Sequence, residues 1–150
     1  MEDSIELSFQ IYYEDTVTPL LFGSERTITD FKEFTCLCLD CNPSDILCGI
    51  APSICKDCYE VSGDVAEEFI KAFGDSHKSE LLRPSIFNPN DKDKYMLDLW
   101  AACRLVFLEA GIPEEHIEIT NYCTRCNPKL FYSHRIMGAN RGSLAAFISL

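Results

Sequence analysis

A strict alternation of apolar and polar positions marks the first predicted element. Over Ile5–Tyr13 every second residue is apolar or aromatic, and the positions between them are mostly polar. Successive side chains of a strand point to opposite faces of a sheet, so this period of two predicts a half-buried strand. Residues 14–45 carry a mixed pattern that could hold a second strand and a short helix near Ile28–Leu39.

A buried strand and two helices are predicted further along the chain. The apolar run Asp45–Pro52 is typical of a buried strand that ends at its proline. Asp64–Phe73 has apolar residues four positions apart, acidic residues in the first turn and Gly74 as a stop, which predicts a helix. Tyr95–Pro113 predicts a second helix, closed by its own glycine and proline. Its apolar stripe consists of Leu97, Trp100, Ala101, Leu105 and Leu108.

Turn residues and short apolar runs make up the C-terminal part. His116–Tyr122, Lys129–His134 and Ser143–Leu150 are each typical of short strands. Gly138–Gly142 predicts a hairpin turn between the last two of them. Strands and helices interleave along the whole chain, which favours an α/β or α+β sandwich formed as a single domain over residues 1–150.

Charge limits the classes of partner. The formal charge is −11, from 24 acidic and 13 basic residues, and it repels phosphate backbones and acidic membrane surfaces. The sequence has no run of about 18 apolar residues, and its acidic N-terminus does not resemble a secretory signal. We therefore expect a soluble, cytoplasmic protein that binds neither nucleic acid nor membranes.

Nine cysteines raise the question of a metal site. Their odd number and the missing secretory signal disfavour a disulfide framework. Pairs with Cys-x-x-Cys spacing are typical of tetrahedral zinc sites, but 65 positions separate Cys58 from Cys123, far more than in zinc ribbons. Reduced thiols with a structural role are therefore favoured, and a redox pair at Cys55 and Cys58 is one alternative. The other is a zinc site formed by Cys55, Cys58, Cys123 and Cys126, with Cys36, Cys38 and Cys41 as further candidates.

Histidines are sparse, and one of the three stands beside an arginine. His77 and His116 lie in polar stretches and are expected to be solvated, whereas His134 lies where a buried, oriented imidazole would fit. Arg135 follows His134, and a neighbouring cation opposes protonation of the ring, so the pair suits anion binding better than acid–base catalysis. A strand histidine with satisfied hydrogen bonds is the alternative. Arg141, in the glycine-flanked turn, could add a second guanidinium for a phosphate or carboxylate.

Three stretches together resemble a known family. They are Gly49–Phe69 ("GIAPSICKDCYEVSGDVAEEF"), Leu97–Ile112 ("LDLWAACRLVFLEAGI") and Cys123–Leu150, which begins "CTRCNPKLFYSHR". Their order and separation resemble the C-terminal half of the laccase-domain family, also labelled polyphenol oxidase, purine nucleoside phosphorylase or peptidoglycan editing factor. The resemblance covers residues 45–150, and residues 1–44 diverge from the family.

The resemblance implies a fold and an activity. The fold would be an incomplete version of the family's α/β/β/α layered sandwich. The activity would be zinc-dependent cleavage of adenosine, inosine, guanosine and methylthioadenosine by phosphate, together with deamination of adenosine. Copper is the alternative metal to zinc. Candidates for binding the purine nucleoside and phosphate are Tyr59, His134, Arg135 and Arg141.

The metal-binding motifs of the family have no counterpart in this sequence. They lie in the N-terminal half of its members, whereas residues 1–44 here contain no histidine. No catalytic residue is therefore assigned, and the chain is expected to be truncated and inactive alone. Two alternative functions follow: a non-catalytic binding or assembly module, which associates with itself or with a missing N-terminal half, and a small zinc-thiolate structural protein.

Overall fold

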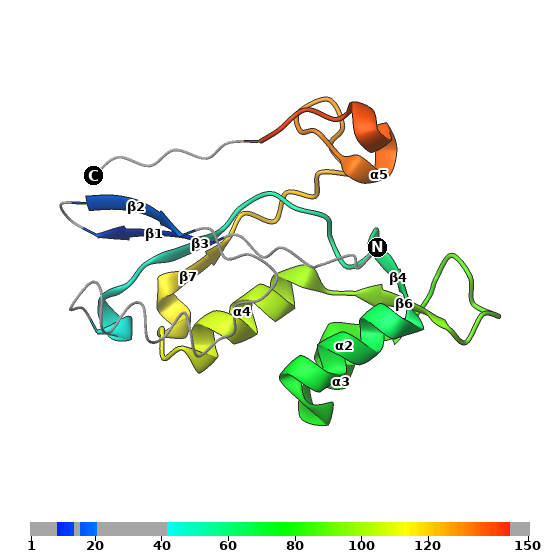
Figure 1. The fold of residues 1–150 in the computed structure, drawn as a ribbon, viewed down its shortest axis with the longest axis horizontal. Helices are drawn as coiled ribbons and strands as arrows, with labels where there is room; N and C mark the ends of the chain where they lie inside the picture. Colours follow the sequence, from blue (N-terminus) through cyan, green and yellow to red (C-terminus); the bar gives the residue numbers. More distant parts are fainter. Residues whose placement is uncertain (1–8, 14–15, 21–41, 145–150) are drawn as a thin grey trace. The chain divides into compact units, whose positions relative to one another are not determined.

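The structure, a computed structural model, describes residues 9–13, 16–20 and 42–144. The chain divides into two compact units. Among the described residues, the first unit comprises the N-terminal hairpin, residues 42–50 and residues 103–119, and the second comprises residues 51–102 and 120–144. Strands and helices are mixed along the chain, as the α+β prediction requires (Figure 1).

The N-terminal elements form a β-hairpin. Strand β1 (Phe9–Tyr13) pairs antiparallel with β2 (Thr16–Leu20), so that Phe9 lies opposite Leu20 (Figure 1). The predicted first strand is thus confirmed over its described part, and residues 14–45 do contain a second strand. The helix expected near residues 28–39 lies outside the described residues.

The first unit contains a parallel strand pair. Strand β3 (Cys48–Ile50) lies beside β7 (Ile117–Ile119), with Cys48 opposite Ile117. β3 confirms the buried strand predicted before Pro52. Short 3-10 turns precede both strands, η1 at Pro43–Asp45 and η3 at Glu114–His116. Within residues 42–50 and 103–119 of this unit, the buried apolar side chains are Ile46, Cys48, Ile50, Leu105, Val106, Phe107, Ala110 and Ile112.

The second unit contains a three-stranded antiparallel sheet. Its order is β4 (Glu60–Ser62), β6 (Lys94–Leu97) and β5 (Leu82–Pro84), so β6 is the central strand. Asn88–Asp93 form an exposed loop between β5 and β6. The buried apolar side chains of this unit are Val61, Ala66, Phe69, Leu81, Leu82, Met96, Leu97, Ala102 and Cys123.

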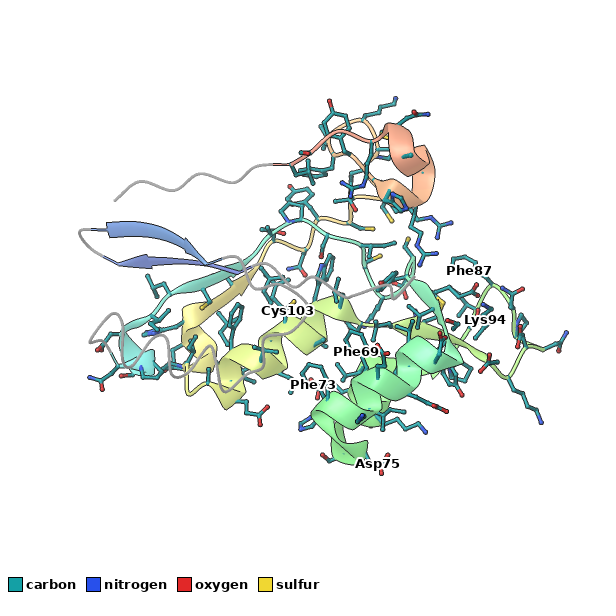
Figure 2. All side chains as sticks on the ribbon, in the orientation of Figure 1. Phe69, Phe73, Asp75, Phe87, Lys94 and Cys103 are labelled. Atoms are coloured by element: carbon teal, nitrogen blue, oxygen red, sulfur yellow. The ribbon has the colours of Figure 1, made fainter. Side chains whose placement is uncertain are left out.

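Helix α2 (Gly63–Phe73) confirms the first predicted helix. It contacts β4 and β6, and Phe69 is buried while Phe73 is half-buried beside it (Figure 2). The two rings stack with their centroids 5.9 Å apart. Gly74 ends the helix with a φ of 83°, a left-handed conformation that glycine adopts at little cost. The turn η2 (Asp75–His77) and the short helix α3 (Lys78–Leu81) follow.

The second predicted helix begins later than the sequence pattern indicates. Tyr95–Leu97 belong to the central strand β6, and helix α4 spans Leu99–Glu109. A side-chain oxygen of Asp98 accepts a hydrogen bond from the backbone N–H of Ala101 at 3.1 Å, so Asp98 is the N-cap. Gly111, with a φ of 94°, follows the end of the helix as predicted. Among the described residues, no helix is long and apolar enough to cross a bilayer.

The predicted strand Lys129–His134 and the hairpin after it are wrong. The backbone N–H groups of Leu130 and Phe131 both donate to the carbonyl of Asn127 at 3.0 Å, which curls this segment into a turn. A short helix, α5 (His134–Met137), and a 3-10 turn, η4 (Gly138–Asn140), then occupy the place of the hairpin. Ser143 and Leu144 are not in a strand, and the rest of the last predicted strand lies outside the described residues.

Candidate functional site

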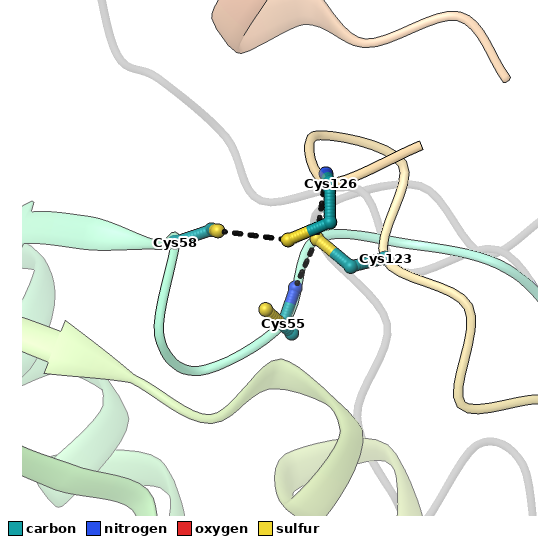
Figure 3. A group of neighbouring side chains, drawn as sticks. All are labelled: Cys55, Cys58, Cys123 and Cys126. Carbon is teal, nitrogen blue, oxygen red and sulfur yellow. Dashed lines mark hydrogen bonds between the residues drawn. The ribbon is translucent and has the colours of Figure 1, made fainter. Parts of the chain in front are cut away.

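Four cysteine thiols gather at one point of the second unit. The Sγ atoms of Cys55, Cys58, Cys123 and Cys126 all lie within 4.8 Å of one another (Figure 3). The Sγ atoms of Cys58 and Cys126 lie 3.5 Å apart, within hydrogen-bonding distance for sulfur. All four cysteines are free, so they form a cluster of reduced thiols.

Each Cys-x-x-Cys pair lies in a tight turn that brings its two thiols together. In the first turn, the backbone N–H groups of Cys58 and Tyr59 donate to the carbonyl of Cys55 at 2.9 and 3.1 Å. In the second, the carbonyl of Cys123 accepts from the backbone N–H of Asn127 at 3.1 Å and from its side-chain amide at 2.8 Å. Both turns therefore place the first and fourth residues of the motif on the same side.

A bridge between the two chain segments brings the turns together. Ser53 pairs in parallel with Cys123, and the backbone N–H of Thr124 donates to the Ser53 carbonyl at 3.0 Å. The indole N–H of Trp100 in turn donates to the hydroxyl of Ser53. The segment before the first cysteine pair is thus fixed on one side by Cys123 and on the other by α4.

Backbone donors prepare one thiol to carry negative charge. Burial raises the pKa of Cys123, but hydrogen bonds from the backbone N–H groups of Cys55 and Cys126, at 3.3 and 3.4 Å, outweigh it and lower the pKa to about 7. Burial and the hydrogen bond to Cys126 raise the pKa of Cys58. Cys48, an ordinary core cysteine in the first unit, has a pKa raised to about 12 by burial alone.

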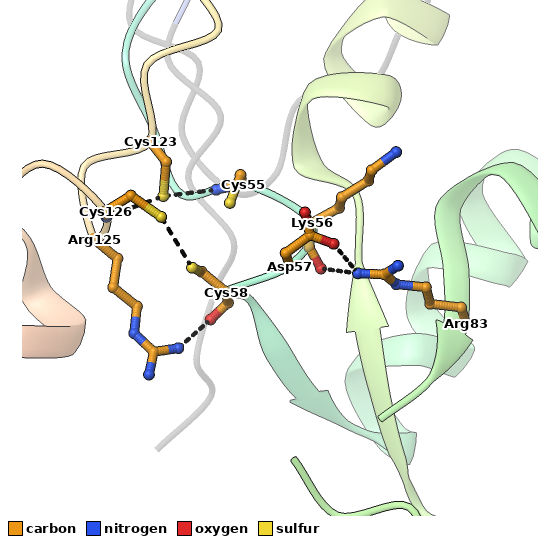
Figure 4. A network of polar contacts seen from close by, with 8 residues as sticks. All are labelled: Cys55, Lys56, Asp57, Cys58, Arg83, Cys123, Arg125 and Cys126. Atoms are coloured by element: carbon orange, nitrogen blue, oxygen red, sulfur yellow. Dashed lines mark hydrogen bonds and ion pairs between the residues drawn. The ribbon is translucent and has the colours of Figure 1, made fainter. Parts of the chain in front are cut away.

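Basic side chains surround the thiols. Arg125 lies between the two cysteines of the second pair, donates to the carbonyl of Cys58 at 3.0 Å and places its guanidinium 5.1 Å from the ring centre of Phe87. Arg83 binds the carboxylate of Asp57 and donates to the carbonyl of Lys56 at 3.2 Å (Figure 4). These contacts fix the backbone of the first turn, and Arg125 links the second turn to it.

The long sequence separation is a poor guide to this site. The spacing between Cys58 and Cys123 argues against a shared metal site, yet the fold brings both Cys-x-x-Cys pairs together. Tertiary contacts such as the Ser53–Cys123 bridge close the intervening chain into a loop, which the sequence pattern does not reveal. The four cysteines could hold a metal ion; Cys36, Cys38 and Cys41 lie outside the described residues.

The four residues proposed for substrate binding form two contacting pairs. The guanidinium carbon of Arg135 lies 5.2 Å from the ring centre of Tyr59, and the same side chain donates to the carbonyl of Glu60 at 2.9 Å. Arg141 Nε donates to His134 Nδ1 at 3.4 Å. Three of these residues come from the α5–η4 region, and Tyr59 comes from the turn that ends the first cysteine pair.

The expectation of a buried His134 is wrong, because the ring is exposed at the start of α5. The side chain of His77, expected to be solvated, is 40% exposed, and its ring nitrogen lies 3.5 Å from a carboxylate oxygen of Glu80. His116 is half-buried, and its Nδ1 is buried and has no hydrogen-bond partner within the described part of the chain. Neither ring is part of the thiol cluster.

Sequence reasoning missed a carboxylate next to these residues. Glu60 accepts hydrogen bonds from the hydroxyl of Ser85 and the amide of Asn88, and these two contacts, in that order, lower its pKa. Glu60 lies on β4, and Ser85 and Asn88 follow β5, the strand on the other side of β6. The signal in the sequence was an acidic residue directly after Tyr59, which a single sequence cannot distinguish from an ordinary surface residue.

Two proteins of known name are similar to this chain in sequence. Purine nucleoside phosphorylase YlmD of Bacillus subtilis is 36% identical over 109 residues, which is 73% of this chain and 37% of that protein. Adenosine deaminase RL5, from an unknown prokaryotic organism, is 36% identical over 97 residues, covering 65% of this chain and 35% of RL5. The chain therefore spans little more than a third of the length of these relatives.

Solved structures show the same fold. The hypothetical protein YfiH of Bacillus licheniformis matches with a TM-score of 0.62 and 29% identity over 72% of this chain and 38% of that structure. YlmD of Geobacillus stearothermophilus matches with a TM-score of 0.61 and 32% identity over the same shares. The family described as multi-copper polyphenol oxidoreductase laccase matches residues 25–150, more than four fifths of the sequence. With the motifs, the fold and these relatives in agreement, the chain belongs to this laccase-domain family.

Proposed function

We propose that this chain is the C-terminal part of a purine nucleoside phosphorylase-like enzyme, in which it supplies binding groups for phosphate and nucleoside. The observation that carries the proposal is the position of Arg135, which is held by the ring of Tyr59 and the carbonyl of Glu60. Arg141, six residues further along, donates to His134 and provides a second cationic group. Two guanidinium groups on one short segment suit a phosphate anion, because each is a fork-shaped donor.

The reaction proposed is phosphorolysis. An oxygen of phosphate forms a bond to C1′ of the ribose while the bond from C1′ to the purine nitrogen breaks. The purine leaves with the electron pair of that bond and takes up a proton, and ribose 1-phosphate is the other product. Arg135 and Arg141 would position the phosphate and balance its charge, since preorganised donors favour an anionic reactant.

The catalytic zinc expected for the family does not fit the described residues. Such a site is expected to use two histidines and one cysteine, and within the ranges 9–13, 16–20 and 42–144 the metal-sized cluster consists of cysteines alone. We therefore assign no catalytic metal ligand to this chain, and the phosphorolysis step is derived without one. The ligands would have to come from the part of the enzyme that corresponds to the remaining two thirds of the relatives.

A chimeric enzyme tests the proposal. In Bacillus subtilis YlmD, the segment that matches this chain is replaced by residues 45–150, and hypoxanthine release from inosine is followed by chromatography. The folded chimera should release hypoxanthine only when phosphate is present, and this chain alone should not. Inosine formed from adenosine would report the deaminase activity separately.

The chimera also has a control for folding. Its secondary structure and elution volume should match those of YlmD before activity is compared. A chimera that folds but shows no phosphate-dependent release would overturn the proposal, as would full activity after Arg135 and Arg141 are both changed to alanine.

A second candidate function is an assembly module, and exposed apolar side chains favour it. Five large hydrophobic residues are exposed between residues 122 and 144, with Leu130 at 69%. They are Tyr122, Leu130, Tyr132, Ile136 and Leu144. Exposed apolar residues grouped in this way are typical of surfaces that pack against a partner. The partner we propose is a chain corresponding to the N-terminal part of the relatives, which this sequence does not match.

Co-purification tests the assembly function. The N-terminal part of Bacillus subtilis YlmD, expressed separately, should elute together with this chain in size-exclusion chromatography. Leu130→Asp should abolish the joint peak. Leu47→Asp, at an equally exposed position in the first unit, should leave it unchanged. Separate elution of the two wild-type chains would rule out this function.

A further inference from the structure

We infer that Cys55, Cys58, Cys123 and Cys126 bind one zinc ion as a four-thiolate site that clasps the two turns of the second unit together. This site differs from the catalytic zinc expected for the family in its ligands and in its task. It also does not depend on the proposed phosphorolysis, because it contains no substrate-binding group.

The size of the cluster fits a zinc ion. A Zn–S bond is about 2.3 Å long, and four sulfurs in a tetrahedron around it are therefore about 3.8 Å apart. The Sγ atoms here lie within 4.8 Å of one another, and those of Cys58 and Cys126 are 3.5 Å apart. Binding would require the thiols to draw together by up to about 1 Å, and both turns already hold their thiols on the same side.

Apolar packing does not account for this cluster. Three of its thiols are accessible to solvent, since Cys55 and Cys58 are half-buried and Cys126 is exposed. Cysteine that fills a core is fully enclosed, as Cys48 is in the first unit. A cluster in which three of the four thiols reach solvent, and Cys123 alone is buried, instead has the access that a metal ion requires.

The surroundings suit the charge of the bound state. Each thiol loses its proton to solvent when it binds, so a four-thiolate zinc site carries a net charge of −2. In a chain of net charge −11 this is unfavourable unless cations lie close by. Each turn carries one basic residue between its cysteines, Lys56 in the first and Arg125 in the second. Arg83 also contacts the first turn, where it offsets the carboxylate of Asp57.

Backbone hydrogen bonds supply the outer contacts of a metal site. The Sγ atom of Cys123 accepts from the N–H groups of Cys55 and Cys126, at 3.3 and 3.4 Å. Outer contacts of this kind orient metal ligands and stabilise their charged form. One of the two donors comes from the other turn, so the hydrogen bonds already link the two segments that the metal would join.

The expected role is structural. The four thiolates would fill all four coordination positions of the zinc ion, which leaves no position for water or substrate. The zinc ion would join residues 55–58 to residues 123–126. It would thereby fix Tyr59, which follows the first turn and whose ring contacts the guanidinium of Arg135. All-thiolate ligands favour zinc over magnesium or calcium, which prefer oxygen.

Metal content and cobalt spectroscopy test the inference on the whole chain. Protein purified under reducing conditions should contain one zinc ion per chain by elemental analysis. Cobalt added after chelation should give the intense visible bands of a tetrahedral site and the near-ultraviolet charge-transfer band of cobalt–thiolate bonds. Cys58→Ser and Cys126→Ser should each weaken zinc binding by more than about 100-fold, because loss of an outer contact alone costs 10–100-fold.

Matched variants separate this site from other cysteines. Cys103→Ser, in α4, should keep the zinc ion and the cobalt spectrum, and so should the triple variant Cys36→Ser, Cys38→Ser, Cys41→Ser. In wild-type protein, four thiols should become reactive only after the chelator is added, a readout that does not depend on any variant folding.

Several results would overturn the inference. They are the absence of bound metal, iron in place of zinc, a disulfide between Cys58 and Cys126 in freshly reduced protein, and loss of zinc from the triple variant but not from Cys58→Ser. Failure of phosphorolysis would leave the inference intact, since zinc content and cobalt spectra are measured without substrate.

Discussion

The Sγ atoms of Cys58 and Cys126 lie 3.5 Å apart, although the two residues are 68 positions apart in the chain. A disulfide bond is about 2.05 Å long, so this contact is between two separate thiols. Thiols at this distance can share a metal ion, or they can oxidise to a disulfide if no metal protects them. Metal content and redox state should therefore be measured on the same sample.

Removing the left-handed glycine after α4 should destabilise the first unit. Gly111→Ala places a side chain at a φ of 94°, which costs about 1–2 kcal/mol because Cβ approaches the backbone. Urea unfolding should show this loss. Gly49→Ala is the control: a Cβ at Gly49 meets no atom within 4 Å, and its φ is not positive, so the free energy of unfolding should change by less than about 0.5 kcal/mol. Equal effects of the two substitutions would contradict the explanation.

Phe69 should be the more important of the two stacked phenylalanines on α2. It is 4% exposed, whereas Phe73 is only half-buried. Phe69→Ala should lower the free energy of unfolding by about 3–5 kcal/mol through lost burial and the cavity left behind. Phe73→Ala should cost clearly less, and chemical denaturation of the two variants compares them directly. A larger loss from Phe73→Ala would contradict the packing described for α2.

Arg135 should matter more for activity than for stability. Its guanidinium lies over Tyr59 at an exposed position, so Arg135→Ala should cost no more than about 1 kcal/mol of stability. In the chimeric enzyme the same change should reduce kcat/KM for phosphorolysis about 100-fold, through loss of a donor to phosphate. Arg104→Ala, which removes the ion pair with Glu114 in the first unit, is the control and should keep kcat/KM near that of the parent. Similar losses from both substitutions would argue against a role of Arg135 in binding phosphate.

Stability of the metal-free protein should depend on pH in a defined direction. The pKa of Cys123 is about 7 in the folded state and 9.0 when unperturbed, so the unfolded state binds more protons between pH 7 and 9 and stability rises with pH there. The raised pKa values of Cys48, Cys55 and Cys58 act in the opposite direction, and stability should fall above about pH 9. Urea midpoints measured in chelator at several pH values check this. A profile that is flat or falls from pH 7 to 9 would contradict it, and Cys123→Ser should remove the rise.

Helices with clear stop signals could be predicted from the sequence, and so could the start of α2, but the start of α4 could not. Gly74 and Gly111 both end helices as expected. Each adopts a positive φ, which glycine tolerates whatever its tertiary contacts, so the residue type alone marks the stop. Tyr95–Leu97 fit a helical stripe equally well, yet they form the central strand between β4 and β5. Asp98 was the signal that could have corrected this, since an aspartate directly before an apolar run is a common N-cap.

Residues of the site were found in the sequence, whereas their arrangement was not. The motifs around Tyr59 and His134 led to the correct family. The strand expected at Lys129–His134 is wrong because Asn127 accepts hydrogen bonds that curl the chain, and the local apolar pattern does not show this. The four thiols meet through the bridge from Ser53 to Cys123, a long-range contact that no local pattern could reveal.

The bridge between Ser53 and Cys123 also has a consequence for the order of folding. It joins segments separated by about half of the chain, so its formation is opposed by the loss of entropy on closing a long loop. Contacts of such high sequence separation form slowly, after local turns and hairpins. The two cysteine turns can form early and independently, but the complete cluster exists only once the chain between them has collapsed. Colour from cobalt present during refolding should therefore appear with the slowest folding phase and report the completion of the second unit.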